Sequence, residues 1–489
     1  MDLLSDRQLY FGGGVALLAV LVALLTPLRD PLSEVPGPWY ARWTDLPIKY
    51  LGLTGRKPIY IQTLHLKYGP IVRVSPREVY VADPAAAQQI HRIKKKFLKD
   101  PWYANFVSGQ DSVFSARDVD VHRRHRKLLS APLSEPGLKA FLPQVEAKVR
   151  LAIQRMGEEA ETRGAADILK WWMFMATDVI GELSFGESFR MLEHGKMNQY
   201  GADLQAIGSF AALRTTFPFL FRLARVYNVP VPFMNKAKAA SLRILSYAAE
   251  SIQRHRTIVE NEGSNARPTL LSKLYKAGDD ETMTQNEMCG NAQSFIVAGS
   301  DTTSNTLTYL VWAVCRHPAV KAKLIKELEQ LPDDFVYDDV KGLPYLDQVI
   351  DETLRLYPAA PSGLPRAVPP EGVELAGYHL PGGYTVSTQA YSLHLNDDAF
   401  PEPHVFNPER WEKPTRLMKD SFMPFGGDSR NCLGLHLALM ELRLATTRFF
   451  RAFPNATVSG LDGMSDADME AELYFLIIPK GHRCLIQLF

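Results

Sequence analysis

The sequence predicts a mainly α-helical fold with small β-sheets, and two observations carry this prediction. From residue 41 onward, most of the chain spaces its apolar residues as amphipathic or buried helices do. Short runs with the pattern of strands occur only early and late in this body. No internal repeat divides it, so we expect residues 41–489 to form one α-rich unit with a small mixed sheet that joins its distant parts.

The expected elements follow from the spacing of apolar residues and from the breakers between them. The expected helices are Pro143–Glu161, Ile168–Leu183, Ala237–Glu262, Glu287–Arg316, Ala319–Leu328, Leu346–Leu356 and Leu433–Phe450. The expected strands are Ile71–Val74, Val79–Val81, Gly372–Leu375, Thr385–Thr388 and Tyr474–Ile478.

One expected helix is unusually long. Thr284 and Glu287 have the spacing of a capping box, which marks a helix start, and His317-Pro318 is a stop signal. At 1.5 Å per residue, the helix between them spans roughly 45 Å. Because much of its second half is apolar, we expect this helix to cross the centre of the protein.

The N-terminus has the pattern of a membrane anchor. Leu9 to Leu25 is apolar or glycine throughout, at the short end of the roughly 17–25 residues that span a bilayer. No cleavage site of the A-x-A kind follows, which favours an uncleaved anchor over a signal peptide. Arg29 places the body on the cytosolic side. We therefore predict an anchor over residues 1–28, a proline-rich hinge over 29–40 and the body over 41–489.

Charge and cysteine usage exclude several classes of protein. The 489 residues contain 55 Lys and Arg against 54 Asp and Glu, which argues against nucleic acid as a partner. The four cysteines are too few and too scattered for a disulfide framework or a zinc site.

Cys432 nevertheless lies in a distinctive loop. The segment from Phe425 to Gly434 is rich in glycine, and an apolar helix follows it. A cysteine at a helix N-terminus has its thiolate favoured by the helix dipole and by free backbone N–H groups. By itself Cys432 would be interpreted as a buried cysteine in a turn, and the surrounding pattern is what favours a metal ligand.

This loop resembles the signature of the cytochrome P450 superfamily, Phe-x-x-Gly-x-Arg-x-Cys-x-Gly. The chain matches at Phe425, Arg430, Cys432 and Gly434, and Asp428 stands where glycine is usual. The resemblance implies a P450 fold with one haem-thiolate catalytic domain, and haem b held by Cys432 as the axial ligand of the iron. Asp428 can adopt the left-handed backbone that the loop needs, and its carboxylate bears on the potential of the iron.

A second motif, Ala298-Gly-Ser-Asp-Thr-Thr303, lies midway along the long expected helix. Two small residues, Ala298 and Gly299, would let a flat cofactor approach the backbone. A carboxyl beside a hydroxyl can relay protons into an apolar site, whereas the alternative is a polar kink in the helix. The resemblance implies that this motif covers the haem and that Asp301 and Thr302 guide protons to bound oxygen.

Glu352 and Arg355 are three residues apart on an expected helix, so they share one face. Alone, the pair would be interpreted as a solvated surface pair. The resemblance implies instead that it is buried and that Arg410, from the segment Pro408-Glu-Arg-Trp411, joins it. The implied role is structural support of the cysteine loop.

A basic stretch, His122-Arg-Arg-His-Arg-Lys127, is the last motif. The alternative is a solvated basic helix face. The resemblance implies that His122, in place of the usual tryptophan, and Arg126 contact a haem propionate, and that Arg366 does so from a later extended segment. Arg123, Arg124 and Lys127 would then point outward toward an acidic redox partner.

The implied activity is haem-dependent insertion of one oxygen atom from O2 into an apolar small molecule. The chain has no flavin or nicotinamide fingerprint, so electrons would come from a separate NADPH–cytochrome P450 reductase, with cytochrome b5 as a further donor. The implied location is the endoplasmic reticulum membrane, with the catalytic domain on the cytosolic side. The alternatives are a haem-thiolate isomerase or dehydratase that does not use O2, and a non-enzymatic membrane haem sensor.

Family comparison implies a pocket rich in Phe and aliphatic residues, suited to a sizeable apolar ligand. The segments expected to line it are Trp102–Phe114, Phe210–Phe221, Gln293–Ala298, Ala359–Leu364 and Glu472–Phe475. The run Tyr68–Val79 is similar to filamentous-fungal members, which implies an intermediate of fungal secondary metabolism such as a polyketide, terpenoid or alkaloid.

Overall fold

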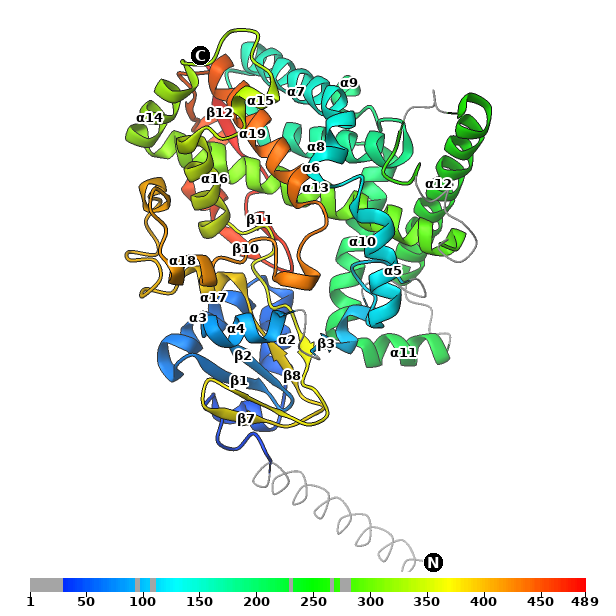
Figure 1. The fold of residues 1–489 in the computed structure, drawn as a ribbon, viewed down its shortest axis with the longest axis vertical. Helices are drawn as coiled ribbons and strands as arrows, with labels where there is room; N and C mark the ends of the chain where they lie inside the picture. Colours follow the sequence, from blue (N-terminus) through cyan, green and yellow to red (C-terminus); the bar gives the residue numbers. More distant parts are fainter. Residues whose placement is uncertain (1–29, 93–96, 106–110, 228–231, 264–267, 273–282) are drawn as a thin grey trace, which may run out of the picture.

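The computed structural model describes residues 30–92, 97–105, 111–227, 232–263, 268–272 and 283–489. The largest sheet lies at one end, and helices form most of the rest of the molecule, with further short strands among them (Figure 1). The predicted membrane anchor over residues 1–28 lies outside the described residues. Within them, no helix combines the length and apolarity needed to cross a membrane.

The helices make up most of the body. They are α2 (Leu46–Leu53), α3 (Lys57–Tyr68), α4 (Pro84–His91), α5 (Val119–Ser130), α6 (Glu135–Leu138), α7 (Leu142–Arg163), α8 (Ile168–Phe185), α9 (Met191–His194), α10 (Gln199–Thr216), α11 (Pro218–Val226), α12 (Pro232–Glu262), α13 (Gln285–Arg316), α14 (Pro318–Leu328), α15 (Tyr337–Val340), α16 (Pro344–Leu356), α17 (Ala390–His394), α18 (Arg416–Ser421) and α19 (Leu435–Ala452). Four short 3-10 helices matter here: η2 (Trp39–Arg42), η3 (Pro101–Asn105), η8 (Pro408–Trp411) and η9 (Asp428–Arg430).

The strands are short and form several small sheets. They are β1 (Ile71–Ser75), β2 (Glu78–Val81), β3 (Leu98–Lys99), β4 (Ala166–Asp167), β5 (Arg366–Ala367), β6 (Val373–Leu375), β7 (Tyr378–Leu380), β8 (Thr385–Ser387), β9 (Thr457–Val458), β10 (Ala471–Leu473), β11 (Ile477–Pro479) and β12 (Leu485–Gln487).

The largest sheet has five strands in the order β1-β2-β8-β5-β3. β2 and β8 are parallel, with Val79 opposite Val386, and the other pairs are antiparallel. The sheet is therefore mixed, as the sequence predicted, but it joins residues 71–99 to residues 366–387 and does not include the last strands of the chain.

The long helix α13 begins and ends where its end signals predict. The Thr284 hydroxyl accepts from the Glu287 N–H at 3.2 Å, and the Glu287 carboxylate accepts from the Thr284 N–H at 2.9 Å. The helix ends at Arg316, directly before His317-Pro318. Along its length it packs against α8, α12, α16 and α19, so it occupies the interior of the helical part.

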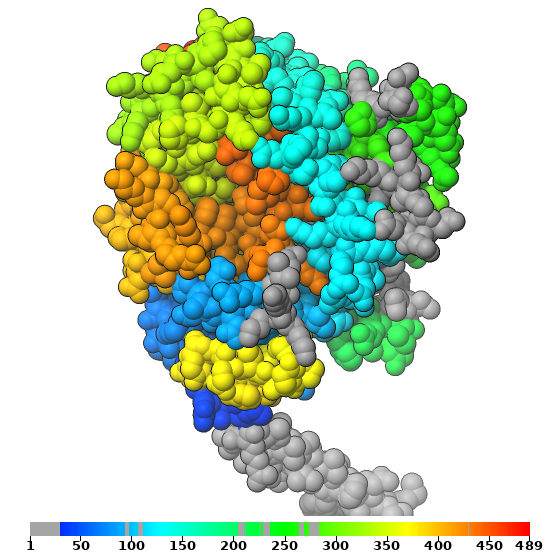
Figure 2. All heavy atoms as spheres, viewed as in Figure 1, coloured from blue at the N-terminus to red at the C-terminus, as the bar shows by residue number. Residues whose placement is uncertain are grey.

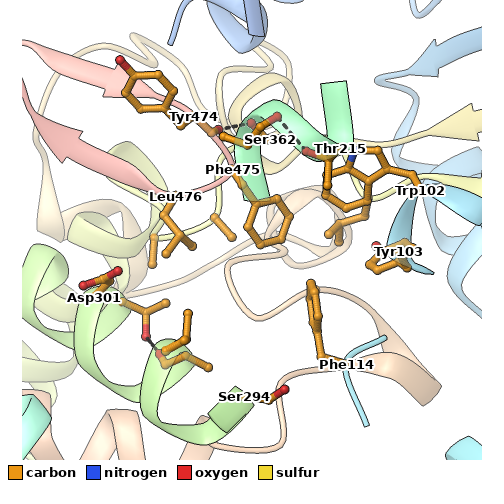
Figure 3. Close-up of a pocket in the computed structure, with 18 of the residues that line it drawn as sticks. Trp102, Tyr103, Phe114, Thr215, Ser294, Asp301, Ser362, Tyr474, Phe475 and Leu476 are labelled. Carbon is orange, nitrogen blue, oxygen red and sulfur yellow. Dashed lines mark hydrogen bonds between the residues drawn. The ribbon is translucent and has the colours of Figure 1, made fainter. Parts of the chain in front are cut away.

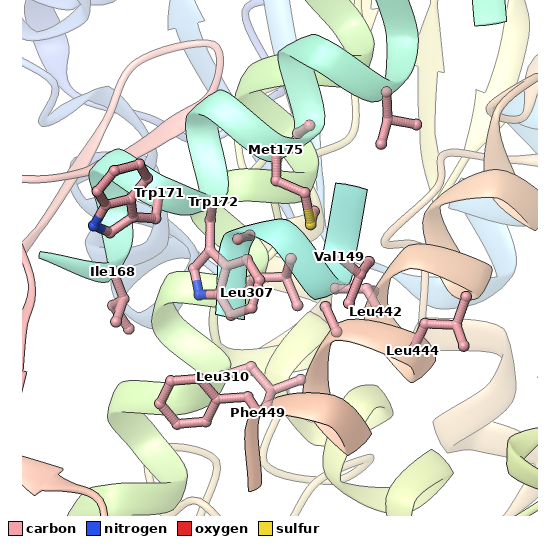
Figure 4. Close-up of a cluster of buried hydrophobic side chains, with 14 of the residues drawn as sticks. Val149, Ile168, Trp171, Trp172, Met175, Leu307, Leu310, Leu442, Leu444 and Phe449 are labelled. Carbon is pink, nitrogen blue, oxygen red and sulfur yellow. The ribbon is translucent and has the colours of Figure 1, made fainter. Parts of the chain in front are cut away.

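The core around α13 is built from the apolar faces of α7, α8 and α19 (Figure 4). Trp172 from α8 is fully buried, and its ring lies 6.1 Å from that of Phe449 on α19. Leu307 and Leu310 of α13 pack beside these rings. This packing fixes α13, which carries the Ala298–Thr303 motif, and α19, which follows the cysteine loop.

One expected strand is wrong. Tyr474–Ile478 is not continuous: β10 ends at Leu473, β11 begins at Ile477, and the residues between them form a turn. The turn directs Phe475 against Phe114, with ring centroids 5.8 Å apart, so an aromatic contact in the interior replaces the expected alternation of a strand.

Residues 30–40 pack against the main sheet. Leu32 and Val35 are buried in the cluster that includes Ile71 and Val386. The Arg73 N–H donates to Pro36 O at 2.8 Å, and the Arg73 guanidinium pairs with Asp30 at 2.5 Å. The role of residues 29–40 as a hinge stays a prediction, because the anchor that they would join lies outside the described residues.

Candidate active site

A single large cavity of about 2290 Å³ connects the sequence motifs. Cys432, Asp301 and Thr302 all line it, although they come from α13 and from the loop before α19. Residues from each of the segments expected to form a ligand pocket line it as well: Trp102, Phe114, Phe210, Phe221, Gln293, Ala298, Ala359, Leu364, Tyr474 and Phe475. Figure 3 shows part of this wall.

The cysteine loop depends on two residues with positive φ. Gly426 has φ 74° and Asp428 has φ 46°, so Asp428 does adopt the left-handed backbone for which glycine is usual. The loop closes when the Cys432 N–H donates to Phe425 O at 2.8 Å. α19 begins at Leu435, so Cys432 lies just before a helix N-terminus.

The Cys432 side chain is exposed to the cavity, although it lies deep within the protein. Burial raises the pKa of its thiol, whereas the Gly434 N–H and the positive charge of Arg126 lower it. Within the described residues, this is the only cysteine that lines the cavity. A bound metal ion would favour the thiolate far more strongly than these groups do.

Four cations gather beside Cys432. Arg126 on α5 donates to the backbone and side-chain carbonyl oxygens of Asn431, and Arg430 donates to Ala116 O at 3.1 Å. Arg366 on β5 donates to the Tyr103 hydroxyl at 3.0 Å. Lys99 on β3 donates to Phe114 O.

Burial and mutual repulsion act on these cations. Burial, and then Arg366, lower the pKa of Arg430 to about 10, and burial also lowers the pKa of Arg126. The pKa of Lys99 is well below its ordinary value for the same reasons. In the described part of the chain, none of the four forms an ion pair with a carboxylate, so the site is built for an anion from outside the chain.

Haem fits this donor set. It has two propionate carboxylates, which the unpaired cations would neutralise, and an iron that needs an axial ligand such as Cys432. His122 also lines the cavity, and burial, together with Arg430, lowers its pKa to about 3, so it is neutral and can donate one N–H. Phe425 lies in the cavity wall beside the cysteine.

Lys99 was not expected in this cluster, and Tyr103 was expected only as part of the pocket-lining segment Trp102–Phe114. A single lysine and a single tyrosine near Pro101 form no motif, so the sequence gives little indication that they belong to this cluster. Only the pairing of β3 with β5, Lys99 opposite Arg366, brings them to the cations.

To the same cavity, α13 presents an acid and a hydroxyl. Burial raises the pKa of Asp301 to about 6. Thr302 donates to Ala298 O at 2.5 Å, so its hydroxyl bonds back to the helix. This bond is the one expected if the motif were a polar kink in the helix. Both residues line the cavity, and Asp301 can change protonation near neutral pH.

Gly299 lines the cavity and is also needed for helix packing. A Cβ atom on Gly299 would lie 2.8 Å from Ile180 Cγ1, so the missing side chain lets α13 approach α8. Ala298, in contrast, is exposed to the cavity. Both small residues therefore line the cavity, and Gly299 in addition lets α13 pack closely against α8.

Glu352, Arg355 and Arg410 form one buried network. Both Glu352 oxygens accept from Arg355 at 2.8 Å, and Oε1 accepts from Arg410 Nε at 3.1 Å. The Asn407 N–H and the Trp411 indole N–H, each at 2.9 Å, complete the carboxylate's partners. Glu352 is fully buried, so all of its acceptor capacity is satisfied inside the protein.

A histidine links this network to the cysteine loop. His394 Nε2 accepts from the Met423 N–H at 2.8 Å, and its Nδ1 lies 3.0 Å from Arg355 O. Burial lowers the pKa of His394 to about 3, so the ring is neutral and Nδ1–H donates to Arg355 O. Met423 lies two residues before Phe425, which means that the network supports the start of the loop.

Glu441 is a further buried acid that sequence reasoning missed. It lies on α19, and the Thr303 hydroxyl of α13 donates to its Oε2 at 3.1 Å. Burial raises its pKa to about 8, against the opposing effect of the Thr303 hydrogen bond. Because its pKa is raised, Glu441 is protonated at neutral pH, and in this form it joins α13 and α19, which both line the cavity. The sequence feature that could have revealed it is an acidic residue in an otherwise apolar helix segment.

We expect Glu441→Gln to change how stability depends on pH. Native Glu441 keeps its proton between about pH 4.5 and about pH 8, whereas the unfolded chain has lost it, so the free energy of unfolding falls as pH rises through this window. The fall reaches at most about 1.4 kcal/mol per pH unit. In Glu441→Gln this fall in the free energy of unfolding is smaller. Denaturation midpoints at about pH 4.5 and about pH 8 measure it. Glu412→Gln, at an exposed position, is the control, and an unchanged slope in Glu441→Gln would contradict the burial effect.

Comparison with known proteins agrees with this site. The model of the family described as Cytochrome P450 matches residues 36–484. The chain is 48% identical to the Cytochrome P450 monooxygenase tazI of Aspergillus terreus, with 96% of each chain covered. It is 41% identical to the Cytochrome P450 monooxygenase azaI of Aspergillus niger, over 91% of this chain and 99% of that one. It is 30% identical to the Tryprostatin B 6-hydroxylase of Aspergillus fumigatus, over 96% and 84%. With the cysteine loop, the cation cluster and the acid–threonine helix around one cavity, this chain belongs to the cytochrome P450 family.

Proposed function

We propose that the chain is a haem-thiolate monooxygenase that inserts one oxygen atom from O2 into an apolar intermediate of fungal secondary metabolism. The observation that carries this proposal is that a thiol from the loop before α19 and an acid–hydroxyl pair from α13 line the same cavity. The similarity to fungal proteins named monooxygenases supports the reaction class.

The chain's own residues hold the cofactor in this proposal. Cys432 would bind the iron, and Arg126, Arg366, Arg430 and His122 would neutralise or bind the propionates. When bound, haem supplies the activation of O2 and the transfer of one oxygen atom. In this proposal the apolar part of the cavity wall limits access of water, which reduces side reactions.

Asp301 and Thr302 supply protons. The carboxyl of Asp301 has its pKa raised to about 6 by burial, so it can take a proton from the solvent side and release it near neutral pH. The Thr302 oxygen, whose proton is donated to Ala298 O at 2.5 Å, can accept a hydrogen bond and hold the next donor in place.

We expect Thr302→Ala to separate electron use from product formation. Without the hydroxyl, proton delivery is misdirected and reducing equivalents are lost as peroxide, with product per NADPH falling roughly 10-fold or more. The measurement is NADPH consumed, peroxide formed and product formed, with a reductase present. Thr308→Ala is the control, because its hydroxyl bonds back to Ser304 O on the same helix away from the cavity. Tight coupling in Thr302→Ala would count against this role.

Electrons come from a separate NADPH–cytochrome P450 reductase, with cytochrome b5 as a further donor, in this proposal. α5 and the segment that carries the cysteine loop lie side by side at the surface (Figure 2). Arg123 and Lys127 are exposed on α5 and suit an acidic partner. Arg124, which was expected to point outward as well, pairs with Glu287 of α13 instead.

The proposed location is the endoplasmic reticulum membrane, with residues 1–28 as the anchor and the catalytic domain on the cytosolic side. Exposed apolar side chains on η2, α2 and α11 support contact with a lipid surface. Trp39 is 77% exposed and Phe219 is 69% exposed. Lys49 of α2 lies 5.6 Å from the ring of Phe217, directly before α11, so α2 and the start of α11 are neighbours.

The two alternatives are less well supported. An isomerase or dehydratase that does not use O2 has no need of the Asp301–Thr302 pair, and a haem sensor has no need of so large an apolar cavity. Consumption of NADPH and O2 with a reductase present tests all three. Product-linked consumption supports the monooxygenase, and haem-loaded protein that consumes neither would overturn it.

A further inference from the structure

Ser294 differs from the other hydroxyl-bearing residues of α13. Every other Ser and Thr hydroxyl on this helix donates a hydrogen bond inside the protein: those of Ser300, Thr302, Thr303, Ser304, Thr306 and Thr308. The Ser294 hydroxyl makes none within the described ranges, and the residue lines the cavity. A helical serine normally bonds back to a preceding carbonyl, so this hydroxyl is available to a ligand.

The distance between Ser294 and Asp301 along α13 indicates how long a ligand that contacts both must be. Ser294 and Asp301 are seven residues apart, which is close to two helical turns, so they lie on the same face of α13. Along the axis they are roughly 10 Å apart. Figure 3 shows both on this helix at the edge of the cavity. A ligand that reaches both has a polar group at one end and its reacting carbon about two helical turns away.

Aromatic rings form the wall that faces this helix. Phe475, from the turn between β10 and β11, lies 5.6 Å from the Trp102 ring and 5.8 Å from the Phe114 ring. Phe475 projects toward the middle of the view in Figure 3. These rings come from three separate segments, and such a wall favours stacking and edge contacts with flat rings.

From these observations we infer that the substrate is a rigid, planar polycyclic aromatic compound that carries an oxygen substituent, with Ser294 as the anchor for that oxygen. A single ring is too short to reach from Ser294 to the Asp301–Thr302 pair, whereas several fused rings bridge this distance. The inference rests on the proposed monooxygenase function, because it takes Asp301 and Thr302 as the reacting end of the cavity.

Four probes test ring planarity and the oxygen anchor separately in the haem-loaded enzyme. Pyrene and 1-hydroxypyrene are flat and differ only in the hydroxyl. Androstane and androstanol are saturated polycyclic compounds that differ in the same way. The readout is the dissociation constant, taken from the shift of the haem absorbance band on binding and, for the two pyrenes, from fluorescence quenching as well.

In the wild-type enzyme, 1-hydroxypyrene is expected to bind roughly two- to tenfold more tightly than pyrene, the range of one neutral hydrogen bond. Ser294→Ala removes this difference and leaves pyrene binding unchanged. Thr308→Ala, which deletes a hydroxyl of the same helix outside the cavity, keeps it. Equal binding of the two pyrenes, or equal weakening of both in Ser294→Ala, overturns the anchor.

The aromatic wall has its own test. Phe475→Leu is expected to weaken both pyrenes roughly two- to tenfold and to leave both androstanes unchanged, because leucine keeps the apolar contact but not the ring. Phe489→Leu, an exposed ring at the end of the chain, is the control. Androstanes that bind as tightly as pyrenes, or no binding of any probe, overturn the planar class. A failure of the proposed function shows separately, as haem-loaded enzyme that consumes neither NADPH nor O2.

Discussion

Cys432→Ala is expected to abolish the red-shifted Soret band of the reduced, CO-bound protein and to remove monooxygenase activity. The band requires a thiolate on the iron, and within the described residues no other cysteine lines the cavity. Changes around a metal ligand typically cost 10- to 100-fold, so loss of the ligand itself should exceed about 100-fold. The measurements are the CO difference spectrum and the rate of product formation.

Cys289→Ala is the matched control for this variant. Cys289 is buried on α13 and does not line the cavity, so its removal should leave the spectrum and the rate unchanged. If haem-loaded Cys432→Ala kept the red-shifted band, the thiolate would come from another residue and the assignment of the site would be wrong.

Glu352→Ala is expected to lower the free energy of unfolding by about 3–5 kcal/mol. The change leaves the guanidinium groups of Arg355 and Arg410 in the interior without their carboxylate, and the Asn407 N–H and the Trp411 indole N–H without an acceptor. Denaturation midpoints measure the loss, and the fraction of protein that retains haem shows whether the cysteine loop has lost its support.

Asp120→Ala is the control for Glu352→Ala. Asp120 also pairs with an arginine three residues away, Arg123, at 2.8 Å, but both side chains are exposed. A surface pair of this kind contributes about 0–1 kcal/mol. If the two variants lost similar stability, the network around Glu352 would be ordinary surface pairing, and its role in holding the loop through His394 would fail.

Local patterns predicted much of this protein. The capping box and the His317-Pro318 stop predicted the ends of α13, since helix ends depend on residues close in sequence. The apolar spacing predicted α7, α8 and α19 to within a few residues of each end. Asp428 was expected to tolerate the left-handed backbone, and its φ of 46° agrees with the short polar side chain of this residue type.

Contacts between distant segments escaped this reasoning. Lys99 reaches the cation cluster only because β3 pairs with β5, and Gly299 faces Ile180 only because α13 crosses α8. Tyr474–Ile478 has the composition of one strand, yet packing of Phe475 against Phe114 makes it a turn. In each case the contacting residue lies far away in the sequence, so the residues around the site do not indicate the contact.

The sequence by itself determined the chemistry of the site: a cysteine in a tight glycine-rich loop, an acid beside a threonine on a long helix, and arginines that suit carboxylates. Residue type and spacing along one element carry that information. Only the tertiary structure decided which groups are buried together, and hence the raised pKa values of Asp301 and Glu441 and the cations that lack acidic partners. Burial is a property of the whole packed chain, so no single segment encodes it.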